Sequence, residues 1–301
     1  MKKIEKYIQI IKKDFPEFSI SSMQLIGEGD NSEAFSVGKE YVFRFPKSTG
    51  AKIQTQREIV TLPRIRSFVN LQIPDFKFIS PRKNFVGYKI IQGEPLMSQV
   101  YFSLKKNVRE SIQHSIGEFL FQLHHIPLSQ LTDCGLETMN LKKEYAENFE
   151  LAKDFIYPNI SKVRQNIITE IFRWYLNDTK NFDFAPALIH NDFSKDHILF
   201  DIVKEQITGI IDFGDIALGD PDYDFMYLYD EFGEDFLKGI FKLYNQSDKN
   251  NLKKKLEFFS LANKIQIILM EKEANDYEAL EEAYNTLNVW LDQHRNTIDK
   301  T

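Results

Sequence analysis

The stretch PALIHNDFSKDHILFD, from Pro186 to Asp201, decides how the whole chain is interpreted. Two apolar runs enclose a turn that carries His190, Asp192 and His197. A second such turn follows in GIIDFGD, where Asp212 comes twenty residues after Asp192 and directly after a β-branched run. Short apolar runs bounded by turn residues are typical of strands. Two acidic turns that each close a strand therefore predict one site built from both.

The residue types in these turns suit phosphate chemistry. A carboxylate at Asp192 can accept a proton from a hydroxyl group, and His197 can turn back toward the same space. His197 and Asp212 can together hold a divalent cation, because hard cations bound to phosphate favour carboxylate oxygen. A single His-x-Asp is more often a capped turn with a satisfied imidazole. The second turn favours a site over that simpler interpretation.

The rest of the chain predicts a small β-rich part followed by a larger helical part. Residues 23–45 are predicted to form three strands separated by turns, in the order MQLIG, EGDNSE, AFSV, GKE and YVFRFP. Apolar residues at helical spacing follow over 51–68, where Pro63 is expected to break or kink the helix. Strand patterns return in 73–80 and 85–93.

Beyond Gly93 the apolar spacing is mainly helical, through 239–296, apart from the two acidic turns. The predicted fold class is therefore α+β. We expect an N-terminal lobe of residues 1–92, a hinge at about 88–93, and a C-terminal lobe of residues 93–301.

Composition and charge exclude several classes of function. A formal net charge of −6 argues against nucleic acid as a partner, because phosphate binding needs a basic face. Cys134 is the single cysteine, so no internal disulfide can form, which fits a reducing cytosol. The N-terminal apolar stretch is too short for a signal peptide, and Ile4, Tyr7, Ile8 and Ile11 share a helical face. No apolar run reaches the ~18 residues of a membrane helix. We expect a cytoplasmic monomer that binds neither nucleic acid nor membranes.

Four segments, in order, resemble one family. VFRFPK, LIHNDFSKDHILF, GIIDFGD and GDPDYDF are similar to the catalytic core of the aminoglycoside phosphotransferases, small-molecule relatives of the protein kinases. The mixture of motifs most resembles the 2″-phosphotransferase branch, and the resemblance covers residues 23 to 235. It implies a bilobal, protein-kinase-like fold with a small β-sheet N-lobe and a larger, mainly α-helical C-lobe.

The resemblance implies a role for each acidic turn. Asp192 matches the catalytic-loop Asp, which orients the acceptor hydroxyl and takes its proton during transfer of the γ-phosphoryl group. Asp212 matches the Asp of the Asp-Phe-Gly motif, which bridges Mg²⁺ to the phosphates of GTP or ATP. His197 stands where most kinases have the Asn that binds a second metal ion, and imidazole is a softer ligand than an amide oxygen. His190 is expected to support the loop.

The phosphate-binding turn is expected between the first two strands. Gly29, Asn31 and Ser32, in IGEGDNSEAF, match the shortened phosphate loop of the family. Glycine there lets backbone N–H groups approach phosphate closely. Taken alone, Gly-x-Gly is more often a plain hairpin turn.

The resemblance places Arg44 at the position of the strand-three lysine of kinases. Arginine keeps the positive charge and adds a bidentate fork. Its expected partner is Glu58 on the following helix. Lys47 is the competing candidate, but it lies past Pro46 and off the face of Arg44.

The hinge suggests which nucleotide is used. Tyr88 falls at the position of the gatekeeper side chain behind the base, and the backbone of Lys89 and Ile91 is expected to meet the base edge. A tyrosine there would crowd adenine, and in the 2″ branch such bulk accompanies the use of guanine. GTP is therefore expected as the preferred donor, with ATP weaker. An ordinary core tyrosine is the alternative.

The acceptor site is expected in an acidic segment. Ten acidic residues and no Lys, Arg or His lie between Glu205 and Leu237. Asp220 and Asp224 are expected to cap the turn in GDPDYDF. Such a run is often a solvated helix face, but beside a phosphoryl donor it suits a polycationic acceptor. We assign these residues to acceptor binding: Asn191, Ser194, Asp215, Asp230, Glu231 and Glu271.

The expected activity is transfer of a phosphoryl group from GTP or ATP to aminoglycosides such as kanamycin, tobramycin and gentamicin, with the 2″-hydroxyl implied by the resemblance alone. Kinases of choline, homoserine or ketosamines would share every phosphate-site residue, but with a more aromatic or much less acidic acceptor pocket. The chain has no Ala-Pro-Glu segment, which disfavours a protein kinase. An inactive nucleotide-binding module would not need both Asp192 and Asp212.

Overall fold

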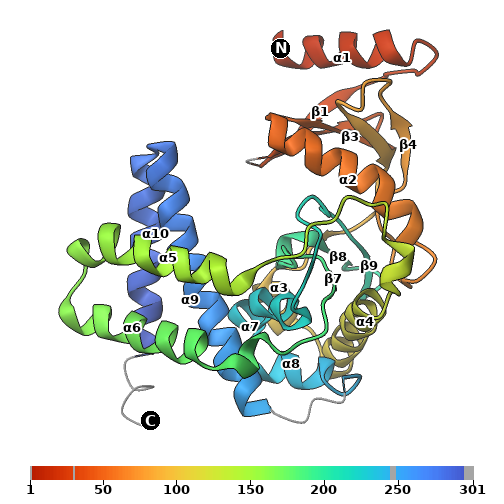
Figure 1. The fold of residues 1–301 in the computed structure, drawn as a ribbon. Helices are drawn as coiled ribbons and strands as arrows, with labels where there is room; N and C mark the ends of the chain where they lie inside the picture. Colours follow the sequence, from red (N-terminus) through yellow and green to blue (C-terminus); the bar gives the residue numbers. More distant parts are fainter. Residues whose placement is uncertain (1, 30, 245–248, 295–301) are drawn as a thin grey trace.

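A five-stranded antiparallel sheet forms the N-terminal part of the molecule, with a helix on each face (Figure 1). The structure is a computed structural model that describes residues 2–29, 31–244 and 249–294. The strand order is β1-β2-β3-β5-β4. The strands are β1 (Met23–Glu28), β2 (Ser32–Val37), β3 (Tyr41–Pro46), β4 (Phe76–Ile79) and β5 (Val86–Lys89).

Strand alternation decides what each face of this sheet holds. Helix α1 (Lys2–Asp14) packs its apolar stripe on one face, against a buried cluster that includes Phe43 and Phe45 of β3. Because side chains alternate along a strand, Arg44 must point to the opposite face. That face is covered by helix α2 (Thr49–Ile65), which lies between the sheet and the rest of the molecule (Figure 1).

Pro63 does not break helix α2, contrary to the expectation from sequence. The helix begins after the side-chain cap of Ser48, whose Oγ accepts the backbone N–H of Ala51, and it runs on to Ile65. Pro63 removes one donor only in the last turn of the helix, so the helix ends two residues later rather than at the proline.

Two small sheets carry the acidic turns. Strand β7 (Ala187–Ile189) pairs with β10 (Ala217–Gly219), while β8 (Ile198–Asp201) lies between β6 (Glu94–Pro95) and β9 (Gln206–Ile210). The first turn joins β7 to β8 and the second joins β9 to β10. Ile189 pairs with Ala217 and Ile198 pairs with Ile210, so both turns connect the same two ends of these sheets. Ile211 donates a backbone hydrogen bond of 3.0 Å to the carbonyl of His197.

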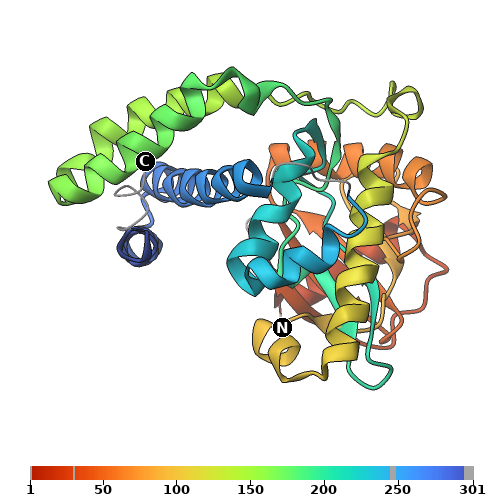
Figure 2. The same ribbon diagram turned by 90° about the horizontal axis from the view of Figure 1, so that it is seen from below.

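The larger part is helical and contains the main core, which confirms the predicted layout of a small β-sheet part and a larger helical part. Its helices are α3 (Ser98–Ser103), α4 (Lys106–His124), α5 (Leu141–Phe155), α6 (Lys162–Asn177), α7 (Met226–Phe232), α8 (Glu234–Ile240), α9 (Lys249–Ala274) and α10 (Tyr277–Gln293). Figure 2 shows α5, α6, α9 and α10 extending together to one side.

The helical stretch predicted over 239–296 is divided among α8, α9 and α10, and residues 245–248 and 295–296 of it lie outside the described residues. Cys134 is buried. Across the described ranges, no helix has both the length and the apolar character that crossing a bilayer requires.

Candidate active site

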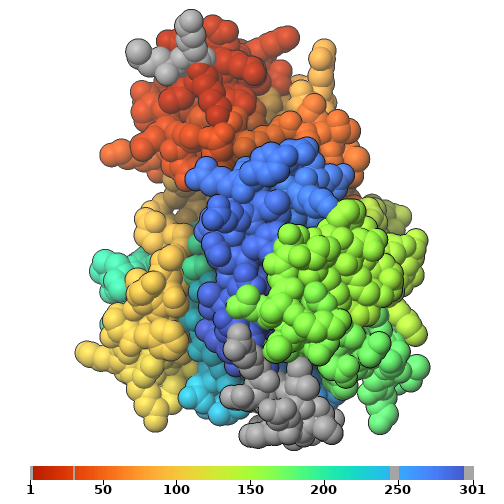
Figure 3. Space-filling view, turned by 90° about the vertical axis from the view of Figure 1, so that its left-hand side faces the viewer, coloured from red at the N-terminus to blue at the C-terminus, as the bar shows by residue number. Residues whose placement is uncertain are grey.

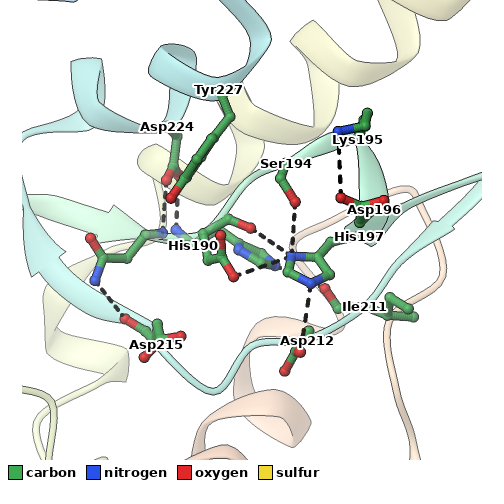
Figure 4. Close-up of polar contacts among 12 residues, drawn as sticks. His190, Ser194, Lys195, Asp196, His197, Ile211, Asp212, Asp215, Asp224 and Tyr227 are labelled. Atoms are coloured by element: carbon green, nitrogen blue, oxygen red, sulfur yellow. Dashed lines mark hydrogen bonds and ion pairs between the residues drawn. The ribbon is translucent and has the colours of Figure 1, made fainter. Parts of the chain in front are cut away.

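The first acidic turn is held in place by a single buried carboxylate. Asp224, which is 1% exposed, accepts the backbone N–H groups of His190 and Asn191 at 2.8 Å each. Asn191 has a φ of 68°, a left-handed conformation that asparagine tolerates better than most residues. The ring of His190 reaches across to the carbonyl of Ile211 at 3.0 Å (Figure 4). These contacts fix the two acidic turns relative to each other.

His197 connects the two acidic side chains (Figure 4). Its Nδ1 lies 2.8 Å from the backbone carbonyl of Asp192 and 3.5 Å from Oδ2 of the same residue. A carbonyl oxygen only accepts, so Nδ1 carries a proton. The other ring nitrogen, Nε2, lies 3.6 Å from Oδ2 of Asp212. The imidazole and the Asp212 carboxylate therefore converge on one point.

The two aspartates have different electrostatic surroundings. Burial raises the pKa of Asp192 to about 6; the nearby Asp215 and Asp212 carboxylates act in the same direction and His197 opposes them. For Asp212, burial also acts to raise the pKa, but Arg44 and His197 outweigh it and hold the pKa below its ordinary value. Asp212 is therefore a persistent anion, whereas Asp192 exchanges a proton near neutral pH.

Arg44 lies where the strand-three lysine was expected. Its Nη2 contacts the carboxylate of Glu58 on α2, and its Nη1 lies 3.2 Å from Oδ1 of Asp212. Burial alone would lower the pKa of Arg44, but Glu58 and Asp212 raise it, so the guanidinium stays charged. Burial raises the pKa of Glu58 to about 7 even with Arg44 beside it. Lys47 points elsewhere, 3.7 Å from Glu28.

The turn between β1 and β2 closes over this site. Gly29 donates its backbone N–H to the carbonyl of Ser32 at 3.1 Å, and the backbone N–H of Lys47 reaches the carbonyl of Asn31 at 2.9 Å. Asp30, which the sequence places in the same turn, lies outside the described residues.

One pocket of about 230 Å³ brings most of the expected phosphate-site residues together. Eight of the assigned residues line it: Gly29, Asn31, Ser32, Arg44, Asp192, His197, Asp212 and Asp215. Glu58 lies behind Arg44. Four lining residues were not assigned from the sequence: Ala51, Gln54, Thr55 and Gly214. Three of these could have been predicted from helical spacing. Ala51, Gln54 and Thr55 precede Glu58 by seven, four and three residues, so they share its face of the helix.

The hinge residues lie outside this pocket. Tyr88 is buried in β5 beside Phe76, with ring centroids 5.8 Å apart, and burial raises its pKa to about 12. Ile90 donates its N–H to the carbonyl of Glu40 at 2.8 Å. Because alternate N–H groups of a strand point to opposite sides, the N–H of Lys89, the last residue of β5, points away from β3.

The residues assigned to acceptor binding are only partly brought together. Asn191 and Asp215 lie beside Asp192, where the Asn191 amide donates to the carbonyl of Asp215 at 3.1 Å. The Oδ1 of Asp215 accepts a 2.7 Å bond from Gln54 of α2. Burial and the negative charge of Asp212 raise the pKa of Asp215. Ser194 follows in the same turn, with its Oγ 3.4 Å from Nδ1 of His197.

Asp230 and Glu231 lie on α7 and Glu271 lies near the end of α9, and none of the three lines this pocket. The sequence suggested that the acidic segment has no basic partners, but in the structure it does. Distant basic residues pair with it: Lys195 with Glu231, Lys255 with Asp220 and Asp222, and Lys264 with Asp230.

Of the two residues expected to cap the turn in GDPDYDF, one does so and the other does not. Asp220 does cap a turn, because its Oδ1 accepts the N–H of Asp222 at 3.0 Å. Asp224 does not; its carboxylate holds the first acidic turn instead. The expectation for Asp224 was wrong because its partners lie more than thirty residues earlier in the chain.

Comparisons with known proteins agree with this geometry. The sequence model of the phosphotransferase enzyme family (APH) matches residues 22–258. The structure of the GDP and kanamycin complex of APH(2″)-IIIa superposes with a TM-score of 0.91, at 30% identity, covering 96% of this chain and 99% of that one. The gentamicin complex of APH(2″)-IIa superposes with a TM-score of 0.77, at 26% identity, covering 94% and 95%.

A curated relative, the uncharacterized protein YcbJ of Bacillus subtilis, is 22% identical over 221 residues, which are 70% of this chain and 69% of the relative. The similar solved structures include several aminoglycoside 2″-phosphotransferases, and the chain shares their kinase-like fold. The match to the family model covers well over half of the chain. The chain therefore belongs to the phosphotransferase enzyme family.

Proposed function

We propose that this phosphotransferase moves the γ-phosphoryl group of a nucleoside triphosphate to a hydroxyl group of an aminoglycoside. The observation that carries the proposal is the single pocket in which Arg44, His197 and Asp212 face Asp192. One side of this pocket suits a triphosphate, and the other holds a carboxylate that accepts protons. The relatives solved with GDP and kanamycin, and with gentamicin, support an aminoglycoside as the acceptor.

Asp192 is the proposed base. It would accept a hydrogen bond from the acceptor hydroxyl and take its proton, while the hydroxyl oxygen forms a bond to the γ-phosphorus and the bond to the β,γ-bridging oxygen breaks. The nucleoside diphosphate leaves, and the proton ends on Asp192. A pKa of about 6 suits this role, because the group is mostly ionised at neutral pH yet basic enough to receive a proton.

Arg44 and the turn at Gly29 would hold the phosphates of the donor. The guanidinium is fixed by Glu58, so it can present charge to a phosphate oxygen without first having to be ordered. Backbone N–H groups of the turn add donors without bulk.

The residues present fit a magnesium ion. Asp212 Oδ2 and His197 Nε2 converge at 3.6 Å, and Nε2 is free to bind a metal because the proton of the neutral ring is on Nδ1. Within the described residues no group of three or more His, Cys, Asp or Glu can hold a metal ion alone. Phosphate oxygens and water would complete the coordination. Bound Mg²⁺ would neutralise charge on the transferred group.

GTP is the proposed donor, with ATP weaker. The supporting observation is Tyr88, the residue that the family resemblance assigns to the gatekeeper position, whose ring is buried beside Phe76. APH(2″)-IIIa was solved with GDP, but APH(2″)-IIa was solved with ATP and streptomycin, so the fold accommodates either base. The 2″-hydroxyl is the proposed acceptor position, by likeness to these relatives.

Turnover with purified protein tests the proposal. The expected result is phosphorylation of kanamycin, tobramycin or gentamicin with GTP and Mg²⁺, with mass spectrometry showing one added phosphate and NMR locating it at the 2″ position. Choline, homoserine and a ketosamine serve as competing acceptors in parallel assays. Turnover with one of these and with no aminoglycoside would overturn the proposal, as would the absence of turnover with any acceptor.

A further inference from the structure

Two lysines from distant parts of the chain neutralise the acidic residues of helix α7. Lys264 of α9 places its Nζ 2.8 Å from Oδ2 of Asp230 and 2.9 Å from the hydroxyl of Ser260. Lys195, three residues after Asp192, places its Nζ 2.6 Å from Oε1 of Glu231. Neither lysine could be paired with its carboxylate from local sequence, because the partners lie more than thirty residues apart.

These ion pairs lie next to the reacting group. Tyr227 of α7 points toward the catalytic turn in Figure 4, and the negative charge of Asp192 contributes, after burial, to raising the pKa of Tyr227. Asp230 and Glu231 follow Tyr227 by three and four residues, so they occupy the next turn of the same helical face. An acceptor whose hydroxyl meets Asp192 would extend along this face.

A pocket of about 600 Å³ opens at Asp230 and Lys264. Trp290 of α10 and the carboxylates of Glu234 and Glu282 also line it. Figure 3 shows α10 reaching the surface between the yellow segment that contains α3 and the green segment of α5 and α6. The pocket has a size suited to a small molecule, and its carboxylates suit a cationic one, while Trp290 stacks on His294 in its wall.

We propose that Lys264 and Lys195 are specificity-determining residues of the acceptor site. Each lysine occupies a carboxylate that an ammonium group of the acceptor would otherwise bind. The charges of Asp230 and Glu231 are cancelled by the two lysines, so the site offers an incoming polycation less negative charge than its carboxylates suggest. This inference rests on the proposed function, which puts a cationic acceptor along α7.

Removing one of these lysines should change the affinity for polycations in the direction opposite to the usual one. Removing a polar residue from a binding site normally weakens binding, but removing either lysine charge releases a carboxylate and strengthens the binding of polycations. The side chain of Lys264 is only 14% exposed and Asp230 only 26%, so the released charge is partly shielded from water. We expect the dissociation constant of a polycation to fall about three- to tenfold, in line with one charge-assisted contact. The gain should shrink as salt is added.

The test is calorimetric titration of kanamycin into wild type and Lys264→Gln at low salt. Kanamycin should bind about three- to tenfold more tightly to the variant, while Lys264→Arg, which keeps the charge, should match wild type. The control is Lys204→Gln, which removes one lysine charge from a more exposed pair of 3.2 Å with Asp201 outside the acceptor site and should change nothing. An unchanged or weaker affinity in Lys264→Gln would overturn the proposal.

A double-mutant cycle assigns the effect to the ion pair. In an Asp230→Asn background, Lys264→Gln should bring no further gain, because no carboxylate is left to release. A full gain in that background would overturn the proposal. If Lys264→Gln does not fold, Lys195→Gln provides the same test at Glu231.

Spermidine, a simple polyamine, separates this inference from the proposed function. If wild type phosphorylates no aminoglycoside, the proposed function fails. Titration of spermidine still decides the role of the lysines: tighter binding to Lys264→Gln than to wild type supports it, and equal binding overturns it.

Discussion

Asp224 and His124 form a buried pair beside the first acidic turn, with His124 Nε2 3.0 Å from Oδ2 of Asp224. The same carboxylate accepts the backbone N–H groups of His190 and Asn191. A carboxylate only accepts, so His124 Nε2 carries a proton, and Nδ1 lies 3.0 Å from the hydroxyl of Tyr244. Helix α4 thus supports, through Asp224, the backbone of the two residues that precede Asp192.

Replacing Asp224 with Asn should lower both stability and turnover. An amide offers one acceptor oxygen, and its NH₂ group would face a backbone N–H. Hydrogen bonds to a charged group are worth about 1.5–3 kcal/mol each, so the free energy of unfolding should fall by about 2–4 kcal/mol. Urea denaturation measures this, and kcat should fall while the KM for nucleotide changes little. Tyr244→Phe, which removes only the outermost hydroxyl, is the milder control; an equal loss in both variants would contradict this account.

Asp192→Asn should abolish most turnover and leave nucleotide binding nearly intact. The loss of a positioned base typically costs about 10²–10⁴ in rate, and Asp192 makes no ion pair with the phosphate-site Arg44. Steady-state kcat and equilibrium binding of GTP measure the two effects separately. A variant that kept more than about a tenth of wild-type kcat would show that another group takes the proton.

Tyr88→Ala should improve kcat/KM for ATP more than for GTP. The ring of Tyr88 is buried against Phe76, and its removal leaves space at the edge where the base is expected. Paired kinetics with the two nucleotides measure the change in preference. Equal effects on both nucleotides would assign Tyr88 to core packing alone.

The sequence foretold local chemistry better than long-range pairing. The catalytic turns and the contact between Arg44 and Glu58 were predictable, because each depends on a short motif or on the known register of a strand and helix. Lys264 and Lys195 were not connected to Asp230 and Glu231, because tertiary folding alone brings α9 and the catalytic turn to α7. A run of acidic residues in a sequence therefore does not reveal the electrostatic potential around that segment after folding, because distant basic residues can pair with it.

Gln54 illustrates the same limit from the other direction. Its helix and its face follow from the spacing to Glu58, yet its 2.7 Å bond to Asp215 crosses between the two parts of the molecule. Only the packing of α2 over the second acidic turn produces that contact. Asp215, assigned from sequence to the acceptor alone, is thereby also a link between the N-terminal and C-terminal parts.

Helix α1 reaches the phosphate turn from outside the segment that the family model matches, which starts at residue 22. Glu28 and Glu33 are cross-strand partners that flank the turn. Lys3 contacts both carboxylates, and the hydroxyl of Tyr7 donates to Glu33. Burial and Glu33 raise the pKa of Tyr7 to about 12, so the phenol keeps the proton that it donates. Helix α1 thus holds together the two strand residues that flank the turn.

Removing the contacts of Lys3 and Tyr7 with these carboxylates should weaken nucleotide binding and leave acceptor binding unchanged. Tyr7→Phe removes one hydrogen bond to a carboxylate. Lys3→Met removes an exposed ion pair with Glu28, which is individually weak, and a second ion pair with the buried carboxylate of Glu33. Together they should raise the KM for GTP about three- to tenfold, because the turn must be ordered again each time phosphate binds. The KM for the aminoglycoside should stay constant, since no residue of α1 lines the pocket at Asp230 and Lys264.

Two controls separate positioning from simple stability. Lys13→Met removes a charge at the far end of the same helix and should leave the KM for GTP unchanged. Lys3→Arg keeps both ion pairs and should restore the wild-type value. If the double variant lost thermal stability but kept its KM for GTP, α1 would serve only to cover the sheet. If both KM values rose together, the defect would lie in the relation between the two parts of the molecule, and the phosphate turn would not be the element that α1 positions.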